Sequence, residues 1–185
     1  MERTLVILKP DTVQRAIVGE IITRFERTGL KIVGMKMMVP EMELLTKHYP
    51  DALIPIVGGK TKEDWDASGV EYSESIEEIG EMIVKATRKF MQEAPVVAMV
   101  LQGGHAVEIV RKMVGKTGPK DSAPGTIRGD YAHLSLGHAS LAKKGAANIV
   151  HASGSVDEAN TEIDMWFEQH ELFDYKTVHE ALTHA

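Results

Sequence analysis

The sequence predicts an α+β fold of the ferredoxin-like type, a four-stranded antiparallel sheet with helices on its faces, in one domain over residues 1–185. Apolar runs typical of short strands alternate with amphipathic helical patterns, in the order strand, helix, strand, helices, strand, helix, strand, helix. No internal repeat and no long linker divides the 185 residues, a length usual for a single domain. A doubly wound three-layer sheet is the alternative, because the number of strands does not fix their order.

Composition excludes several classes of protein. The chain is 43% hydrophobic and 26% charged, which is typical of a globular domain and not of a disordered or collagen-like chain. It has no cysteine, which excludes disulfide scaffolds, thiolate zinc sites and iron–sulfur clusters. With 21 Lys and Arg against 27 Asp and Glu, general binding to nucleic acid or membranes is not expected. The apolar run near the N-terminus is too short for a secretion signal, so we expect a cytoplasmic protein.

The first third of the chain predicts a strand, a helix, a strand and a short helix. Residues 4–8 form an apolar run that Pro10 ends, because proline cannot donate to a strand ladder. Asp11 is predicted to cap the next helix, with Gln14 completing a capping box. The elements expected after this cap are a helix ending at Gly29, a strand over residues 30–39 and a helix over residues 41–49.

The remainder of the chain predicts two strands among helices and two stretches without a clear pattern. Ser75 with Glu78, and Ser155 with Glu158, each form a capping-box pattern that opens a helix. The clearest buried strand covers residues 95–101. The other expected elements are a helix over 106–114, a loop over 115–129 and a strand over 148–152, while residues 50–72 and 131–147 show no definite pattern.

The usual nucleotide-binding motifs are not present. Residues 59–61 and 115–117 each read Gly-Lys-Thr, like the end of a P-loop. The motif also requires a glycine five residues before that Gly, where this chain has Ile54 and Val110. A P-loop is therefore not expected.

His151 is the candidate nucleophile. It follows an apolar strand and precedes Ala-Ser-Gly-Ser, small residues that leave room for a substrate, at the start of a helix that favours anionic groups. A neutral imidazole is nucleophilic near pH 7. On these residues alone, a histidine packed at a strand end remains an open alternative.

Two cations are candidates for binding phosphate. Arg128 lies between glycines in the loop 124–130, where a flexible backbone could present its guanidinium to phosphate oxygens. A solvated arginine on a surface turn is the alternative. Lys9, at the end of the first strand, is open to the same two interpretations.

Six segments taken together resemble the nucleoside diphosphate kinase family. The most specific are Pro-Gly-Thr-Ile-Arg-Gly-Asp at 124–130 and Asn-Ile-Val-His-Ala-Ser at 148–153. The others are residues 2–11, 13–15 together with 18–22, 95–100 and 166–167. The resemblance implies transfer of the terminal phosphate from a nucleoside triphosphate to a nucleoside diphosphate, by a ping-pong mechanism through a phosphohistidine on His151.

The resemblance also assigns roles to individual residues. Glu162 would hold the other imidazole nitrogen of His151 and fix its tautomer, and Ser153 would lie beside the transferred phosphate. Asn148 would contact the sugar, Thr117 a phosphate, and the cations would offset phosphate charge. The nucleotide-contacting positions implied are Lys9, Tyr49, Arg111, Thr117, Arg128 and Asn148.

Cofactor and partners follow from the same resemblance. It implies Mg²⁺ held mainly by the phosphates, with no protein ligand assigned, and nucleotides such as ATP and GTP as substrates. It further implies a homo-oligomer, expected to be a hexamer. A non-catalytic nucleotide-binding regulator and phosphate transfer to a protein partner are the alternatives.

The chain departs from the family pattern in two ways. The family usually has Asp, near the phosphate-bound metal, where this chain has Gly154. The affinity for the metal or its position is therefore expected to differ from the family's. Segments of about 51–89 and 131–147 are longer than usual. The first falls where the family stacks the base on an aromatic residue; Ile83 and Thr87 are the unaligned candidates here.

Overall fold

The computed structural model describes residues 1–67, 69–142 and 144–183. Their sheet consists of β1 (Glu2–Leu8), β2 (Lys31–Met38), β3 (Val96–Gly103) and β4 (Val150–Ala152). The strand order is β2-β3-β1-β4, and every neighbouring pair is antiparallel. The predicted antiparallel α+β fold is therefore confirmed, and the doubly wound parallel alternative is wrong.

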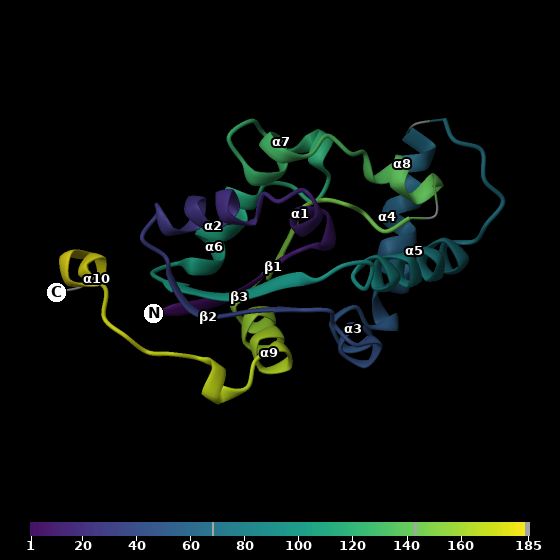
Figure 1. Cartoon of the computed structure of the whole chain (residues 1–185). Helices are drawn as coiled ribbons and strands as arrows, with labels where there is room; N and C mark the ends of the chain where they lie inside the picture. Colours follow the sequence, from purple (N-terminus) through teal and green to yellow (C-terminus); the bar gives the residue numbers. More distant parts are fainter. Residues whose placement is uncertain (68, 143, 184–185) are drawn as a thin grey trace.

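Helices cover both faces of this sheet (Figure 1). On one face lie α1 (Pro10–Gln14), α2 (Val18–Glu26) and α6 (Ala106–Val114), and on the other lie α3 (Met42–His48) and α9 (Val156–Trp166). Alternation along β1 supplies both cores, since Val6 and Leu8 join the first and Leu5 and Ile7 join the second. Lys9, directly after β1, and His151, in the middle of β4, are thus positioned by strands that lie between two packed layers.

The predicted cap at Asp11 is wrong. Helix α1 is capped by Lys9, with Pro10 at its first position and no side-chain cap. The Asp11 carboxylate instead accepts a hydrogen bond from the backbone N–H of Ile149, at 3.0 Å. The expected continuous helix is also interrupted, because Ala16 has a φ of 56° before α2 begins.

The first inserted segment contains a helix that the sequence pattern did not predict. A 3-10 turn (Asp51–Leu53) leads into α4 (Ile54–Ala67), which packs on α5 (Ile76–Phe90). A Cβ on Gly58 would lie 2.0 Å from the Ile76 carbonyl oxygen, so this glycine allows the two backbones to touch. The capping box that opens α5 at Ser75 is confirmed.

The second half of the chain completes the structure with short elements. A 3-10 turn (Pro119–Asp121), α7 (Ile127–Tyr131) and α8 (Leu136–Leu141) precede β4, and a 3-10 turn (Gln169–Glu171) and α10 (Val178–Thr183) follow α9. The C-terminal segment returns to the edge strand β2, where Lys31 Nζ lies 2.9 Å from a Glu180 carboxylate oxygen. Among the described residues no helix is long and apolar enough to cross a membrane.

Candidate functional site

A cleft of about 460 Å³ lies where the ends of β1 and β4 meet α6 and the inserted helices. The predicted nucleophile and all six predicted nucleotide-contacting residues line it, although they come from distant parts of the sequence. These residues are Lys9, Tyr49, Arg111, Thr117, Arg128, Asn148 and His151.

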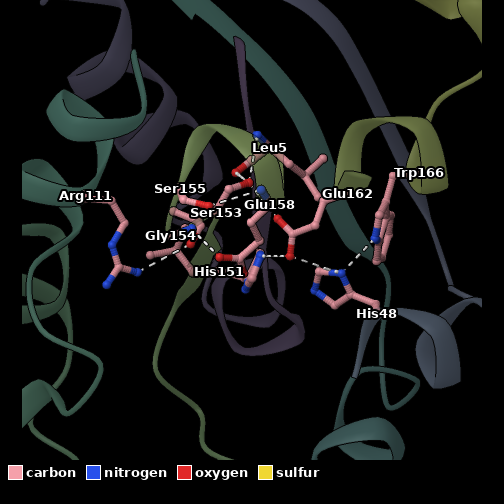
Figure 2. Close-up of polar contacts among 12 residues, drawn as sticks. Leu5, His48, Arg111, His151, Ser153, Gly154, Ser155, Glu158, Glu162 and Trp166 are labelled. Carbon is pink, nitrogen blue, oxygen red and sulfur yellow. Dashed lines mark hydrogen bonds and ion pairs between the residues drawn. The ribbon is translucent and has the colours of Figure 1, made fainter. Parts of the chain in front are cut away.

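The predicted partner of His151 is also in place. His151 Nε2 lies 2.8 Å from Oε1 of Glu162, a buried carboxylate on α9, although the two groups are not aligned as a hydrogen bond (Figure 2). Ser153 Oγ donates to the other oxygen of Glu162, at 2.6 Å. Ser153 is fully buried and lies outside the cleft lining, so it supports Glu162 and does not fit the expected position beside the phosphate.

His48 joins this group, and the sequence pattern gave no indication of it. It ends α3, and its side chain is completely buried. Trp166 Nε1–H donates to His48 Nδ1 at 3.2 Å, and that nitrogen lies 3.4 Å from Oε1 of Glu162. The rings of His48 and His151 meet edge to face, with centroids 4.5 Å apart. The Glu162 carboxylate therefore lies between two imidazoles (Figure 2).

Burial and positive charge make His151 a neutral base. Burial, and then the charge of Lys9, lower the pKa of the His151 imidazole to about 3. Arg128 and Arg111 act in the same direction, and Glu158 acts in the opposite one. At pH 7 the imidazole therefore has a free lone pair for attack.

Lys9 and Asn148 form a hydrogen-bonded chain along the cleft wall. Lys9 Nζ donates to Asn148 Oδ1 at 2.7 Å, and Asn148 Nδ2 donates to the Thr117 carbonyl at 2.9 Å. Burial and the nearby Arg128 lower the pKa of Lys9 to about 8. Each group is consequently fixed in direction before a nucleotide enters.

Arg128 is not the solvated surface arginine of the alternative interpretation. It is only 3% exposed, and its guanidinium donates to the backbone carbonyls of Gly115, Lys116, Asn148 and Val150. An arginine has five N–H donors, so most are already used. Arg111, by contrast, is exposed and makes one long contact, 3.4 Å, to the Ala152 carbonyl.

A strained turn places His151. Ile149 has a φ of 73°, which is unusual for a β-branched residue, and Val150 N–H donates to the Asn148 carbonyl across it at 2.8 Å. The Asp11 carboxylate accepts from Ile149 N–H at 3.0 Å, and Lys9 N–H donates to the Ile149 carbonyl at 2.9 Å. The segment after β1 thus holds the nucleophile strand in a conformation that the sequence did not reveal.

Comparisons with known proteins assign this chain to a family. The family model described as nucleoside diphosphate kinase matches residues 2–53 and 72–172. The chain belongs to the nucleoside diphosphate kinase family. A nucleoside diphosphate kinase of Pyrococcus furiosus is 44% identical over 175 residues, which cover 95% of this chain and 88% of the relative. The predicted activity, phosphate transfer between nucleoside triphosphates and diphosphates, is that of the family.

Solved structures of nucleoside diphosphate kinases agree with the fold. An NDP kinase of Pyrobaculum aerophilum superimposes with a TM-score of 0.88 at 41% identity, covering 94% of this chain and 99% of that one. A transition-state mimic of the Borrelia burgdorferi enzyme, with bound vanadate and ADP, gives 0.81 at 34% identity, covering 98% and 95%. The similarity extends over nearly the whole chain.

Residues 54–71, which the family model leaves unmatched, contain α4 and supply one wall of the cleft. The lining residues of α4 are spaced at i, i+3, i+4 and i+7, so they share one helix face. They are Val57, Lys60, Thr61 and Asp64. Leu136, Ala139 and Ser140 of α8 face the same space. Both Ile83 and Thr87 also line the cleft.

At Gly154, where the resemblance predicts a departure from the family pattern, Glu158 occupies the space that a side chain would need. Glu158 Oε2 accepts a hydrogen bond from Gly154 N–H at 2.9 Å, and a Cβ on Gly154 would lie 2.7 Å from that oxygen. The expected second half of the Ser155 capping box is therefore wrong, although Ser155 Oγ does accept from Glu158 N–H. Gly154 itself is outside the left-handed region, so its backbone does not require glycine.

Among the described residues, the cleft carboxylates and one cluster of histidines are the possible metal ligands. Glu158 and Asp64 are the carboxylates in the cleft lining, and Glu158 is the one whose charge acts on His151. His48, His151 and Glu162 also offer ligand atoms within 4.8 Å of one another. Trp166, however, already occupies the lone pair of His48 Nδ1, so hydrogen bonding accounts for that cluster better than a metal does.

Proposed function

We propose that His151 accepts the phosphate on Nδ1 and that Glu162 orients its ring. The observation that carries the proposal is the 2.8 Å approach of Glu162 Oε1 to Nε2 at the wall of a cleft lined with cations. A proton on Nε2 facing a carboxylate leaves the Nδ1 lone pair free. This nitrogen is therefore the nucleophile that we assign.

The reaction proceeds in two balanced steps. The Nδ1 lone pair attacks the terminal phosphorus of a nucleoside triphosphate, the P–N bond forms, and the bond to the bridging oxygen breaks with its electrons leaving on the diphosphate. A terminal phosphate oxygen of the second diphosphate then attacks, and the P–N bond breaks. Glu162 stabilises the positive charge that develops on the imidazole.

The proposed phosphate-binding residues are Lys9, Arg111, Thr117 and Tyr49. Asn148 would lie near the sugar, and the buried Arg128 would contribute positive charge. Members of the family require a divalent cation, and we propose Mg²⁺. When bound, it would neutralise phosphate charge. The phosphates would supply most of its ligands, and Glu158, directly or through water, would supply the protein's contribution.

The test is incubation with triphosphate labelled at the terminal phosphate. We expect acid-labile, alkali-stable label on His151, and no label in His151→Gln. His170→Ala, an exposed histidine outside the cleft, is the control and should label normally. A chain that binds nucleotide without labelling would instead be the non-catalytic regulator, and nothing in the described site favours that function.

The wider assignments are also proposals. We expect ATP, GTP and other nucleotides to serve, and we expect a homo-oligomer, a hexamer by resemblance. The exposed edge strand β2 supports an assembly, because Met35 and Met37 are 53% and 60% exposed there. Light scattering after size-exclusion chromatography measures the assembled mass.

A further inference from the structure

We propose that His48 is a positioning residue for phosphate transfer: held by Trp166, it keeps the Glu162 carboxylate available to His151 alone. This inference rests on the proposed role of His151 as the phosphate acceptor. His48 is not part of the cleft lining, so it acts through Glu162 and not on the nucleotide.

Trp166 determines which His48 nitrogen carries the proton. Indole N–H is only a donor, so its 3.2 Å contact with His48 Nδ1 requires a lone pair on Nδ1. Burial, and then repulsion that a protonated His151 would exert, lower the pKa of His48 to about 3 against the opposing charge of Glu162, so the ring is neutral near pH 7. Its single ring proton is therefore assigned to Nε2, a buried atom without a hydrogen-bond partner among the described residues.

This tautomer prevents His48 from competing for Glu162. The unprotonated Nδ1 lies 3.4 Å from Glu162 Oε1, and two acceptors cannot hydrogen-bond to each other. Ser153 Oγ occupies the other carboxylate oxygen, at 2.6 Å. The proton on His151 Nε2, 2.8 Å away, is then the one that Oε1 can receive from a histidine.

The opposite tautomer would impair the site. A proton on His48 Nδ1 would be donated to Oε1 and would satisfy the lone pair that His151 requires. The carboxylate would then hold the imidazole less firmly and stabilise less charge on it. Since the His48 side chain is completely buried, it also keeps water away from that oxygen.

The direct test is the ¹H–¹⁵N correlation pattern of the histidine rings in the full-length protein near pH 7. We expect His48 in the Nε2–H form, and Trp166→Phe should move it toward the Nδ1–H form, because the indole donor is lost. A wild-type His48 protonated on Nδ1 would overturn the proposal without any variant.

The kinetic test measures the first-turnover rate of His151 labelling. Trp166→Phe should slow labelling on the order of tenfold to a hundredfold, because small displacements of a reacting group carry penalties of this size. His48→Phe in the Trp166→Phe background removes the competing donor and should restore part of the rate. The affinity for ADP should be unchanged in all variants, which also confirms that they are folded.

The outcomes separate this inference from the proposed function. If the wild-type protein gives no label on His151, the proposed function fails. If it labels and Trp166→Phe labels within twofold of the wild-type rate, only the role of His48 and Trp166 fails. A double variant slower than Trp166→Phe would also contradict the proposal, because two merely structural losses accumulate.

Discussion

Arg111 and Arg128 bring the same charge to the same cleft but are held in opposite ways. Arg128 is buried and donates to four backbone carbonyls, whereas Arg111 is exposed with one long contact. Loss of a buried donor leaves its acceptors unsatisfied, while loss of an exposed donor does not. Arg128 therefore contributes more than Arg111 to the free energy of unfolding, and the sequence alone did not distinguish the two.

Arg128→Ala should lower both the melting temperature and the rate of phosphate transfer. Each orphaned carbonyl costs about 1–3 kcal/mol, so the fold should lose several kcal/mol. Arg111→Ala should leave the melting temperature nearly unchanged while reducing the rate about 10²-fold or more, as expected for one donor to a transition state. Thermal melts and single-turnover rates of the two variants check this, and equal melting temperatures would contradict the structural role of Arg128.

Lys9 should limit activity at high pH. Because burial lowers its pKa to about 8, Lys9 is charged below that value and loses its charge above it. His151, with a pKa of about 3, stays neutral throughout this range. We expect kcat/KM, which reports the free enzyme, to fall as the pH rises through about 8.

Lys9→Arg is the matched variant for this pH profile. Arginine keeps its charge at every pH used, so the fall above about pH 8 should disappear even if the absolute rate is lower. A profile that falls at the same pH in both proteins would show that another group titrates.

At the scale of elements, the contact between α4 and α5 positions the inserted wall of the cleft. Gly58 of α4 meets the Ile76 carbonyl, and Gly80 of α5 meets the Ile54 carbonyl, at sites where a Cβ would lie 2.0 and 2.1 Å from the oxygen. Backbones this close leave α4 little freedom to shift. The α4 face that lines the cleft is consequently fixed by two glycines outside it.

Gly58→Leu should push α4 away from α5 and raise the KM for nucleotides. The rate at which His151 is labelled at saturating nucleotide should change less. Gly59→Ala is the control in the same helix, because a Cβ there meets nothing within 4 Å. It should keep the wild-type KM and gain up to about 1 kcal/mol of stability from helix propensity. Steady-state kinetics and urea unfolding of both variants provide the measurement; equal KM values would contradict the role of α4.

At the scale of the whole molecule, the two buried neutral histidines couple stability to pH. His48 and His151 each have a pKa of about 3 in the folded protein, against 6.5 ordinarily. Between these values the unfolded chain binds protons that the folded one does not, so stability is lost as the pH falls from about 6.5. Above 6.5 this contribution is complete.

His48→Phe should make this loss less steep. Removing one such group reduces the slope of unfolding free energy by up to about 1.4 kcal/mol per pH unit between these values. Urea unfolding at several pH values from 7 to 4 measures it, with the exposed His170→Phe as control. Equal slopes of unfolding free energy against pH in the wild type and His48→Phe would contradict the assigned role of His48.

The sequence predicted what depends on local pattern and missed what depends on distant partners. Apolar runs identified all four strands, and Ser75 identified the start of α5. Gly58 weakens the helical pattern of α4 because its benefit lies in the contact with α5. Asp11 has the local signature of a cap, but its partner Ile149 is 138 residues away.

The candidate site divides in the same way. Lys9, Arg128, Asn148 and His151 were predictable because they lie in segments that resemble a family, and the structure brings them together. The same resemblance assigned Tyr49, Arg111 and Thr117 by position, but it gave no indication of the α4 and α8 residues that line the cleft. His48 lies in no such motif, and its contact with Trp166 spans 118 residues. Ser153 was expected beside the phosphate, but it donates a hydrogen bond to Glu162 of α9 instead. The sequence pattern of β4 does not reveal this contact with a helix.

The strained turn at Ile149 has a consequence for the order in which activity appears during folding. A β-branched residue at a φ of 73° stores about 1–3 kcal/mol, which the segment following β1 and the Arg128 guanidinium offset by hydrogen bonds to residues 148–150. These groups come from residues 9–11 and from Arg128, both distant from the turn in the sequence, so β4 can adopt it only after the tertiary structure has brought them together. In refolding, His151 should become competent for phosphorylation after the secondary structure has formed. The nucleophile is therefore among the last parts of the molecule to mature, and partly folded chains would be protected from premature phosphorylation.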